Sequence, residues 1–80
     1  MTYKAKFKGP TNSRGSRIIV TDWSGKRSEH PWKHELSTEK NYLYAAKFRA
    51  ASDGYLEPFA VMLNTGSAWV FGHDNYLDFI

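Results

Sequence analysis

Residues 3–8 alternate strictly between apolar and basic side chains. Tyr3, Ala5 and Phe7 take one set of positions, and three lysines take the positions between and after them. This period of two is typical of a half-buried strand, whose successive side chains point to opposite faces of a sheet. We expect a strand that buries its apolar residues, with Tyr3 and Phe7 facing a helix, and that ends at the Gly-Pro pair that follows.

Two more strands are predicted before the middle of the chain. The segment 16–23 has β-branched residues at its centre, which favour extended structure. A Ser-Gly pair then predicts a turn, and the segment 26–32 forms a third expected strand. This strand should end near Pro31, because proline within a sheet is confined to edges and strand ends.

A helix is predicted to begin near Ser37 or Thr38, since either hydroxyl can accept a hydrogen bond from the free N–H groups of the first turn. Glu39 is favourable at the positive end of the helix dipole. An apolar stripe at helical spacing consists of Tyr42, Leu43, Ala45, Ala46 and Ala50, and Phe48 lies off it. An Asp-Gly pair at 53–54 ends the helix, because glycine adopts the left-handed conformation without strain.

The last third of the chain predicts a hairpin. Alternating segments at 59–63 and 68–72 flank a turn at 64–67, and an apolar tail at 76–80 should dock as a short strand or against the core. The predicted fold is therefore α+β: one antiparallel sheet of four to five strands with a single helix packed on one face, in one domain spanning residues 1–80.

Charge is distributed unevenly along the 80 residues. Residues 1–28 carry seven lysines and arginines against one carboxylate, a net charge of +6, whereas residues 29–80 carry a net charge of −3. A basic region of this kind attracts nucleic acid or an acidic protein face. The alternative is that the lysines guard an edge strand against aggregation.

Composition narrows the class of protein. The absence of cysteine excludes disulfides and thiol chemistry and fits a reducing compartment. No apolar run approaches the roughly 20 residues of a membrane span, so we expect a soluble cytoplasmic protein without a membrane partner.

The sequence contains no pattern that predicts catalysis. Phosphate-binding glycine loops and the nucleophile elbow are missing. His30 and His34 are four residues apart, a spacing that binds metals on a helix, but Pro31 separates them and the segment precedes the predicted helix. We expect a protein without enzymatic activity, cofactor or metal.

The segment 9–18 reads G-P-T-N-x-R-G-S-R-I and resembles a segment in short proteins of phages and mobile elements. The overall type resembles the small anti-CRISPR proteins. This resemblance implies a non-enzymatic inhibitor in the cytoplasm of a bacterial host. Such a protein would bind a subunit of a CRISPR-Cas effector complex, a type I complex being one candidate, and block its recruitment of DNA.

The candidate partner-binding residues are the basic residues of the first third and one aromatic residue. They are Lys4, Lys6, Lys8, Arg14, Arg17, Lys26, Arg27 and Trp32. Trp23 is a further candidate, as an exposed aromatic side chain that could contact the partner. For both tryptophans, core packing is the alternative.

Two other functions remain open. The same cations can contact phosphates, which gives a small basic nucleic-acid-binding protein. A structural or assembly role in a phage particle would instead involve self-association through a strand edge or the apolar tail. The expected oligomeric state is a monomer or a weak homodimer.

Overall fold

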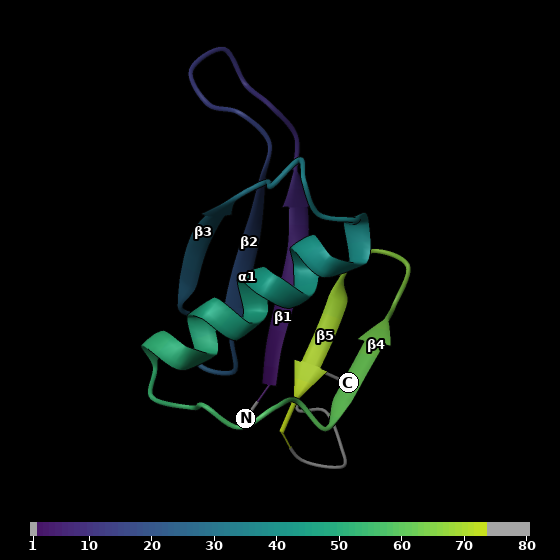
Figure 1. The fold of residues 1–80 in the computed structure, drawn as a ribbon. Coiled ribbons are helices and arrows are strands. Elements are labelled where there is room, and N and C mark those ends of the chain that lie inside the picture. Colours follow the sequence, from purple (N-terminus) through teal and green to yellow (C-terminus); the bar gives the residue numbers. More distant parts are fainter. Residues whose placement is uncertain (1, 74–80) are drawn as a thin grey trace.

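A computed structural model describes residues 2–73 and contains a five-stranded sheet with one helix lying diagonally across one face (Figure 1). The elements are β1 (Thr2–Lys8), β2 (Arg17–Asp22), β3 (Arg27–Pro31), α1 (Thr38–Ser52), β4 (Val61–Asn64) and β5 (Trp69–Gly72). The predicted α+β class, with a single helix packed on one face of an antiparallel sheet, is confirmed. The apolar tail at 76–80 lies outside the described residues.

The strands are arranged in the order β3-β2-β1-β5-β4, and every neighbouring pair is antiparallel. The first three strands form a meander. After β3 the chain crosses the sheet as α1, and the hairpin β4–β5 then places β5 beside β1. The first strand of the chain is therefore the central strand of the sheet, flanked by β2 and β5.

The core lies between α1 and the strands β1 and β2. Tyr3 and Ala5 of β1 and Ile18 and Val20 of β2 are fully buried. The helix meets them with small side chains, the buried Ala45, Ala46 and Ala50. Because alanines add little bulk, the helix backbone packs close to the sheet, and larger rings such as Phe71 fill the space beside it.

Phe7 departs from the prediction that it would be a core residue facing the helix. Its side chain remains 45% exposed, and it packs edge-to-face on Trp32 with 5.3 Å between the ring centroids. The helix packs on the earlier part of β1, so the last apolar position of this strand lies at the rim of the core.

Both ends of α1 form as the sequence predicts. The Ser37 hydroxyl accepts a hydrogen bond of 3.3 Å from the backbone N–H of Lys40, so Ser37 is the N-cap. At the other end, Gly54 has a φ of +95°, which a residue with a Cβ rarely adopts.

A buried arginine ties the helix to the β2–β3 hairpin. The Arg49 Nη2 donates a hydrogen bond of 2.7 Å to the carboxylate of Asp22, and its Nε donates one of 3.1 Å to Asp53. The Nη1 donates to the backbone carbonyls of Val20 and Lys26 and to the Ser28 hydroxyl. Arg49 and Asp22 are both buried, so this ion pair is shielded from water.

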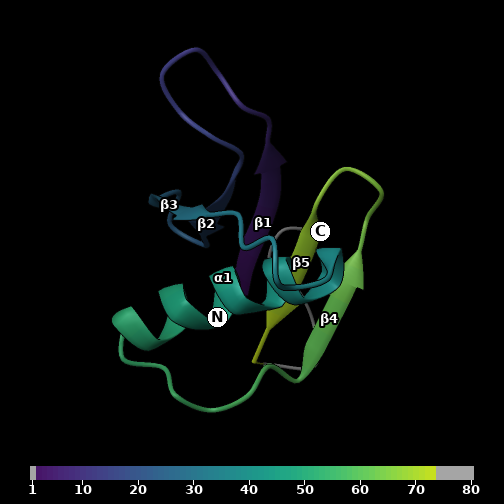
Figure 2. The same cartoon turned by 45° about the horizontal axis from the view of Figure 1, so that its top comes forward.

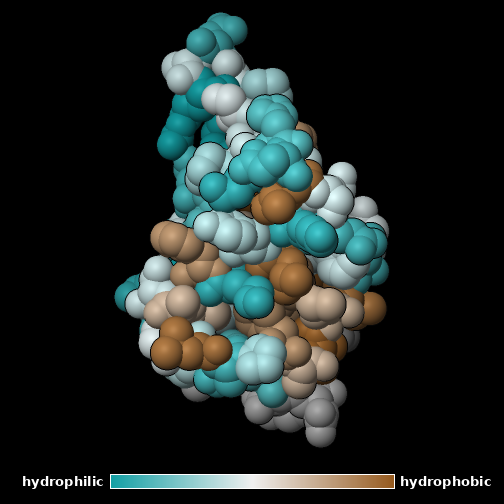
Figure 3. All heavy atoms as spheres, viewed as in Figure 1, coloured by the Kyte–Doolittle hydropathy of each residue, from teal (hydrophilic) through white to brown (hydrophobic). Residues whose placement is uncertain are grey.

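The connection between β1 and β2, residues 9–16, projects from one end of the molecule (Figures 1 and 2). Its surface is strongly hydrophilic, whereas apolar side chains appear around the helix (Figure 3). Among the described residues, no helix has the length and apolar character needed to cross a membrane.

A candidate binding surface on the open face of the sheet

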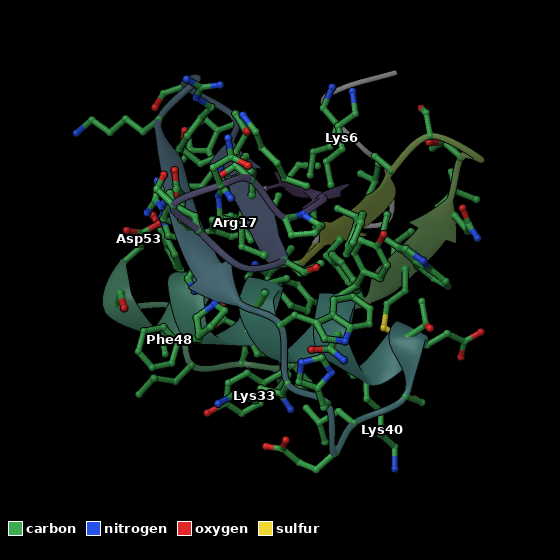
Figure 4. All side chains as sticks on the ribbon, turned by 90° about the horizontal axis from the view of Figure 1, so that it is seen from above. Lys6, Arg17, Lys33, Lys40, Phe48 and Asp53 are labelled. Carbon is green, nitrogen blue, oxygen red and sulfur yellow. The ribbon has the colours of Figure 1, made fainter. Side chains whose placement is uncertain are left out.

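Strand alternation sends the lysines of β1 to the sheet face that α1 does not cover. Lys4 and Lys6 lie opposite Thr21 and Ile19 of β2, and Arg27 of β3 lies on the far side of Thr21. Seen from above, Lys6 points away from the helix (Figure 4). We call the surface formed by Lys4, Lys6, Lys8, Arg27, Ile19 and Thr21 the basic face.

The basic face surrounds a shallow hollow of about 360 Å³ lined by these same side chains, with the ring of Phe7 at its rim. Lys6, Lys8 and Arg27 are exposed. Within residues 2–73, none of these three cations forms an ion pair with a carboxylate. Alternate residues of a strand are about 7 Å apart, so the lysines form a regular row of charges.

The position of β1 contradicts one interpretation of its lysines. The edge strands are β3 and β4, and β1 is the central strand of the sheet, so its lysines do not lie on an edge strand as that interpretation requires. Strand β5 pairs with residues 2–5 of β1, so Lys4 lies between two strands, whereas Lys6 and Lys8 extend past the end of β5 and pair with β2 alone. Like charges about 7 Å apart repel each other by roughly 0.6 kcal/mol in bulk water before salt screening. An anionic partner on this face would replace that repulsion with attraction.

Aromatic side chains of the sheet lie mainly on its other side. Tyr3 is paired with Phe71, and Ala5 with Trp69, so both rings of β5 share the helix-covered face with Tyr3. The basic face thus offers cations and short apolar stems, with little surface on which a nucleobase could stack. Its chemistry suits rows of phosphates or carboxylates.

Arg14 and Arg17 both contact Glu29 of β3. The distances to the Glu29 Oε1 are 2.5 Å from the Arg14 Nη2 and 3.3 Å from the Arg17 Nε. The Arg17 side chain is largely buried, and its Nη1 also donates to the carbonyl of Gly15. The structure therefore gives both arginines an internal role, anchoring the projecting loop. Their predicted contact with a partner stays a prediction.

The remaining candidates lie apart from the basic face. Lys26 is exposed in the β2–β3 turn, where its N–H donates to the Asp22 carboxylate. Trp32 is half-buried and contacts Tyr42 as well as Phe7, so it packs against the core. Trp23 is 42% exposed beside Tyr3. Sequence reasoning brought Lys4, Lys6, Lys8 and Arg27 together only as basic residues, and it missed Ile19 and Thr21 because these require the strand register.

His30 and His34 have ordinary structural surroundings. His30 shares a hydrogen bond of 2.8 Å with the Ser28 hydroxyl, and burial together with the nearby Arg49 guanidinium lowers its pKa from the usual 6.5. His34 is exposed. Residues 2–73 contain no group of three or more histidine and carboxylate side chains close enough to share a metal ion.

Comparison with protein-family models, with curated proteins and with solved structures finds no significant match. Three exposed cations of the basic face, Lys6, Lys8 and Arg27, share one face of the sheet and form no ion pair with a carboxylate among residues 2–73.

Proposed function

We propose that this chain is a non-enzymatic interaction protein of the phage type. It inhibits host defence by binding a CRISPR-Cas effector complex through the basic face and blocking recruitment of DNA. The observation that carries this proposal is the row of lysines on the central strand β1. These charges do not lie on an edge strand, and a binding surface accounts for their presence.

The basic face suits an acidic protein surface in three respects. The backbone beneath it is a hydrogen-bonded sheet, so binding requires little ordering of the main chain. Lys6, Lys8 and Arg27 project from two different strands and span a patch rather than a point. Arg27 can additionally hold a carboxylate with two parallel hydrogen bonds.

The CRISPR setting is supported by the segment 9–18 and its resemblance to short phage proteins. A type I surveillance complex in the cytoplasm of a bacterial host is one candidate target. The partner would be a Cas subunit whose exposed carboxylates lie near its path for DNA.

An interference assay tests this proposal. Cells with an active CRISPR system that express the chain should lose protection against a targeted plasmid or phage, and the tagged chain should capture at least one Cas subunit. Full protection in every CRISPR type tried, together with no captured Cas subunit, would contradict the proposal.

Direct binding of duplex nucleic acid is a second candidate, favoured by the regular spacing of the cations and by the scarcity of stacking surface on the basic face. A mobility-shift titration at about 150 mM salt distinguishes it. If Lys6, Lys8 and Arg27 contact phosphates, the logarithm of the binding constant should fall with the logarithm of salt concentration with a slope of about −2.7. No shift of duplex or single-stranded DNA or RNA would exclude this candidate.

A further inference from the structure

The outer edge of β3 carries backbone groups that the described part of the sheet leaves unpaired. The N–H of Asp22 donates to the carbonyl of Lys26, and the N–H of Trp32 donates to the carbonyl of Ser16. In an antiparallel ladder the backbone groups of alternate residues point the same way, so Ser28 and His30 lie in hydrogen-bonded pairs with β2. The N–H and C=O groups of Arg27 and Glu29, at the positions between them, consequently point outward.

Few pairings of this edge with a copy of itself are possible. Pro31 also points its backbone outward but lacks an N–H, so Arg27 and Glu29 are the strand residues that can both donate and accept. If β3 pairs with β3 of a second copy in a symmetric antiparallel register and uses its outward-pointing residues, the register is centred on Arg27, Ser28 or Glu29. A register centred on Arg27 places the two copies of Arg27 opposite each other, and one centred on Glu29 does the same with the two copies of Glu29. The pairing centred on Ser28 opposes Arg27 of each copy with Glu29 of the other.

We infer that two copies of this chain associate through β3 in that register, as a twofold dimer with one continuous sheet. The dimer contains four new backbone hydrogen bonds, because Arg27 and Glu29 of each copy both donate and accept. Two Arg27–Glu29 charge pairs lie across the strands on the open face, where each Glu29 also contacts Arg14 and Arg17 of its own copy through Oε1. An edge strand that only prevents aggregation would carry charges of one sign, which repel a second copy. The sequence Arg-Ser-Glu of β3 instead places opposite charges next to each other when two copies pair antiparallel.

The helix side of the same edge provides apolar surface for a second copy. A groove of about 490 Å³ runs between β3 and α1, and its lining includes His30, Lys33, Tyr44 and Phe48. Tyr44 and Phe48 are 48% and 56% exposed and stack on each other, and Phe48 also contacts His30. This aromatic patch lies directly beside the edge that would be paired.

The helix reaches the position needed to cover that groove. The C-terminal end of α1 projects past β3 in both ribbon views (Figures 1 and 2), and Phe48 lies on the β3 side of the molecule (Figure 4). A twofold axis through Ser28, perpendicular to the sheet, brings the helix end of one copy over the groove of the other. It also places both basic faces on the same side of the dimer. Arg27 belongs both to the basic face and to this edge, so in the dimer it pairs with Glu29 of the other copy, and Lys6 and Lys8 remain to bind a partner.

A single cysteine tests the register. The chain contains no cysteine, so Ser28→Cys introduces one thiol per copy. In the proposed register the two substituted positions form a non-hydrogen-bonded pair with Cα atoms about 4.5 Å apart, within the range that a disulfide spans. Mild oxidation should yield a reducible covalent dimer, much faster than it does for Ser67→Cys in the exposed β4–β5 turn. Equal rates for the two variants would overturn the register.

The substitution of Ser28 removes a hydroxyl that accepts a hydrogen bond from Arg49. Charge reversal at Arg27 and Glu29 provides a second test that leaves this hydrogen bond in place. Sedimentation at increasing protein concentration should show the wild-type chain dimerising. Arg27→Glu and Glu29→Arg should each remain monomeric, because each opposes like charges. An equimolar mixture of these two variants should dimerise again, because each charge then meets its opposite, and Lys47→Glu should behave as wild type. A wild-type chain that stays monomeric throughout, or a mixture that fails to associate while both variants are folded by circular dichroism, would overturn the inference.

Discussion

The Arg49 guanidinium is held by the carboxylates of Asp22 and Asp53 and by carbonyl groups of the β2–β3 hairpin. Asp22 also accepts hydrogen bonds from the backbone and hydroxyl of Ser24. Tyr3 donates its phenolic proton to Asp53, and burial raises its pKa above the usual 10. One buried cation thus connects the helix end, the central strand and a turn that is distant in sequence.

Removal of the Arg49 guanidinium should lower the stability of the fold substantially. Arg49→Met keeps much of the apolar stem but leaves Asp22 buried without its counter-ion. We expect the free energy of unfolding, measured with urea, to fall by about 3 kcal/mol or more. Arg14→Met is the matched control, because its pair with Glu29 is exposed and should contribute less than about 1 kcal/mol. Equal losses in the two variants would contradict the central role of Arg49.

The carboxyl group of Asp22 also makes the free energy of unfolding depend on pH. Burial alone would raise its pKa, but hydrogen bonds from Ser24 and Lys26 and the charge of Arg49 outweigh burial, so the pKa lies below the usual 3.8. A carboxyl group whose pKa is lower in the folded state stabilises the fold above pH 3.8, and this contribution is lost as pH falls through the folded value. Asp22→Asn should therefore lose less stability than wild type when pH is lowered below about 4, as measured by urea unfolding at several pH values. An equal loss would contradict the shift.

At the scale of elements, local patterns were sufficient to predict most of the fold. Alternation in β1, the Ser37 cap and the glycine stop after α1 each depend on neighbours within a few residues, and the structure confirms them. Phe7 was misplaced because its burial depends on where the helix crosses the sheet, which local periodicity does not contain.

The helix cap makes a measurable contribution. Ser37→Ala removes the hydroxyl that accepts the N–H of Lys40, so we expect a loss of about 1 kcal/mol in the free energy of unfolding. The neighbouring Thr38→Ala lies inside the helix on an exposed position and should change stability by about 0.5 kcal/mol or less. A larger loss of stability for Thr38→Ala than for Ser37→Ala would contradict Ser37 as the N-cap and indicate that Thr38 caps the helix.

At the scale of the whole molecule, strand order decides what the charges mean. The sequence shows that the first third is basic, but it does not show that β1 occupies the centre of the sheet or that Arg27 lies two strands away on the same face. For the same reason Arg14 and Arg17 could be recognised as basic but not as partners of Glu29. Long-range pairing separates the cations used inside the fold from those displayed on the basic face.

The most direct test of the basic face compares two charge-reversed variants of equal net charge. Lys6→Glu/Lys8→Glu alters the basic face, and Lys40→Glu/Lys47→Glu alters exposed positions of α1 by the same four charge units. Both should unfold within about 1 kcal/mol of wild type, because surface substitutions change stability little. In the interference assay, with capture of the effector complex as a second readout, the first variant should lose inhibition and binding at least tenfold, whereas the second should match wild type. Full activity of the β1 variant, or an equal loss in both variants, would contradict the proposal that the protein acts through this face.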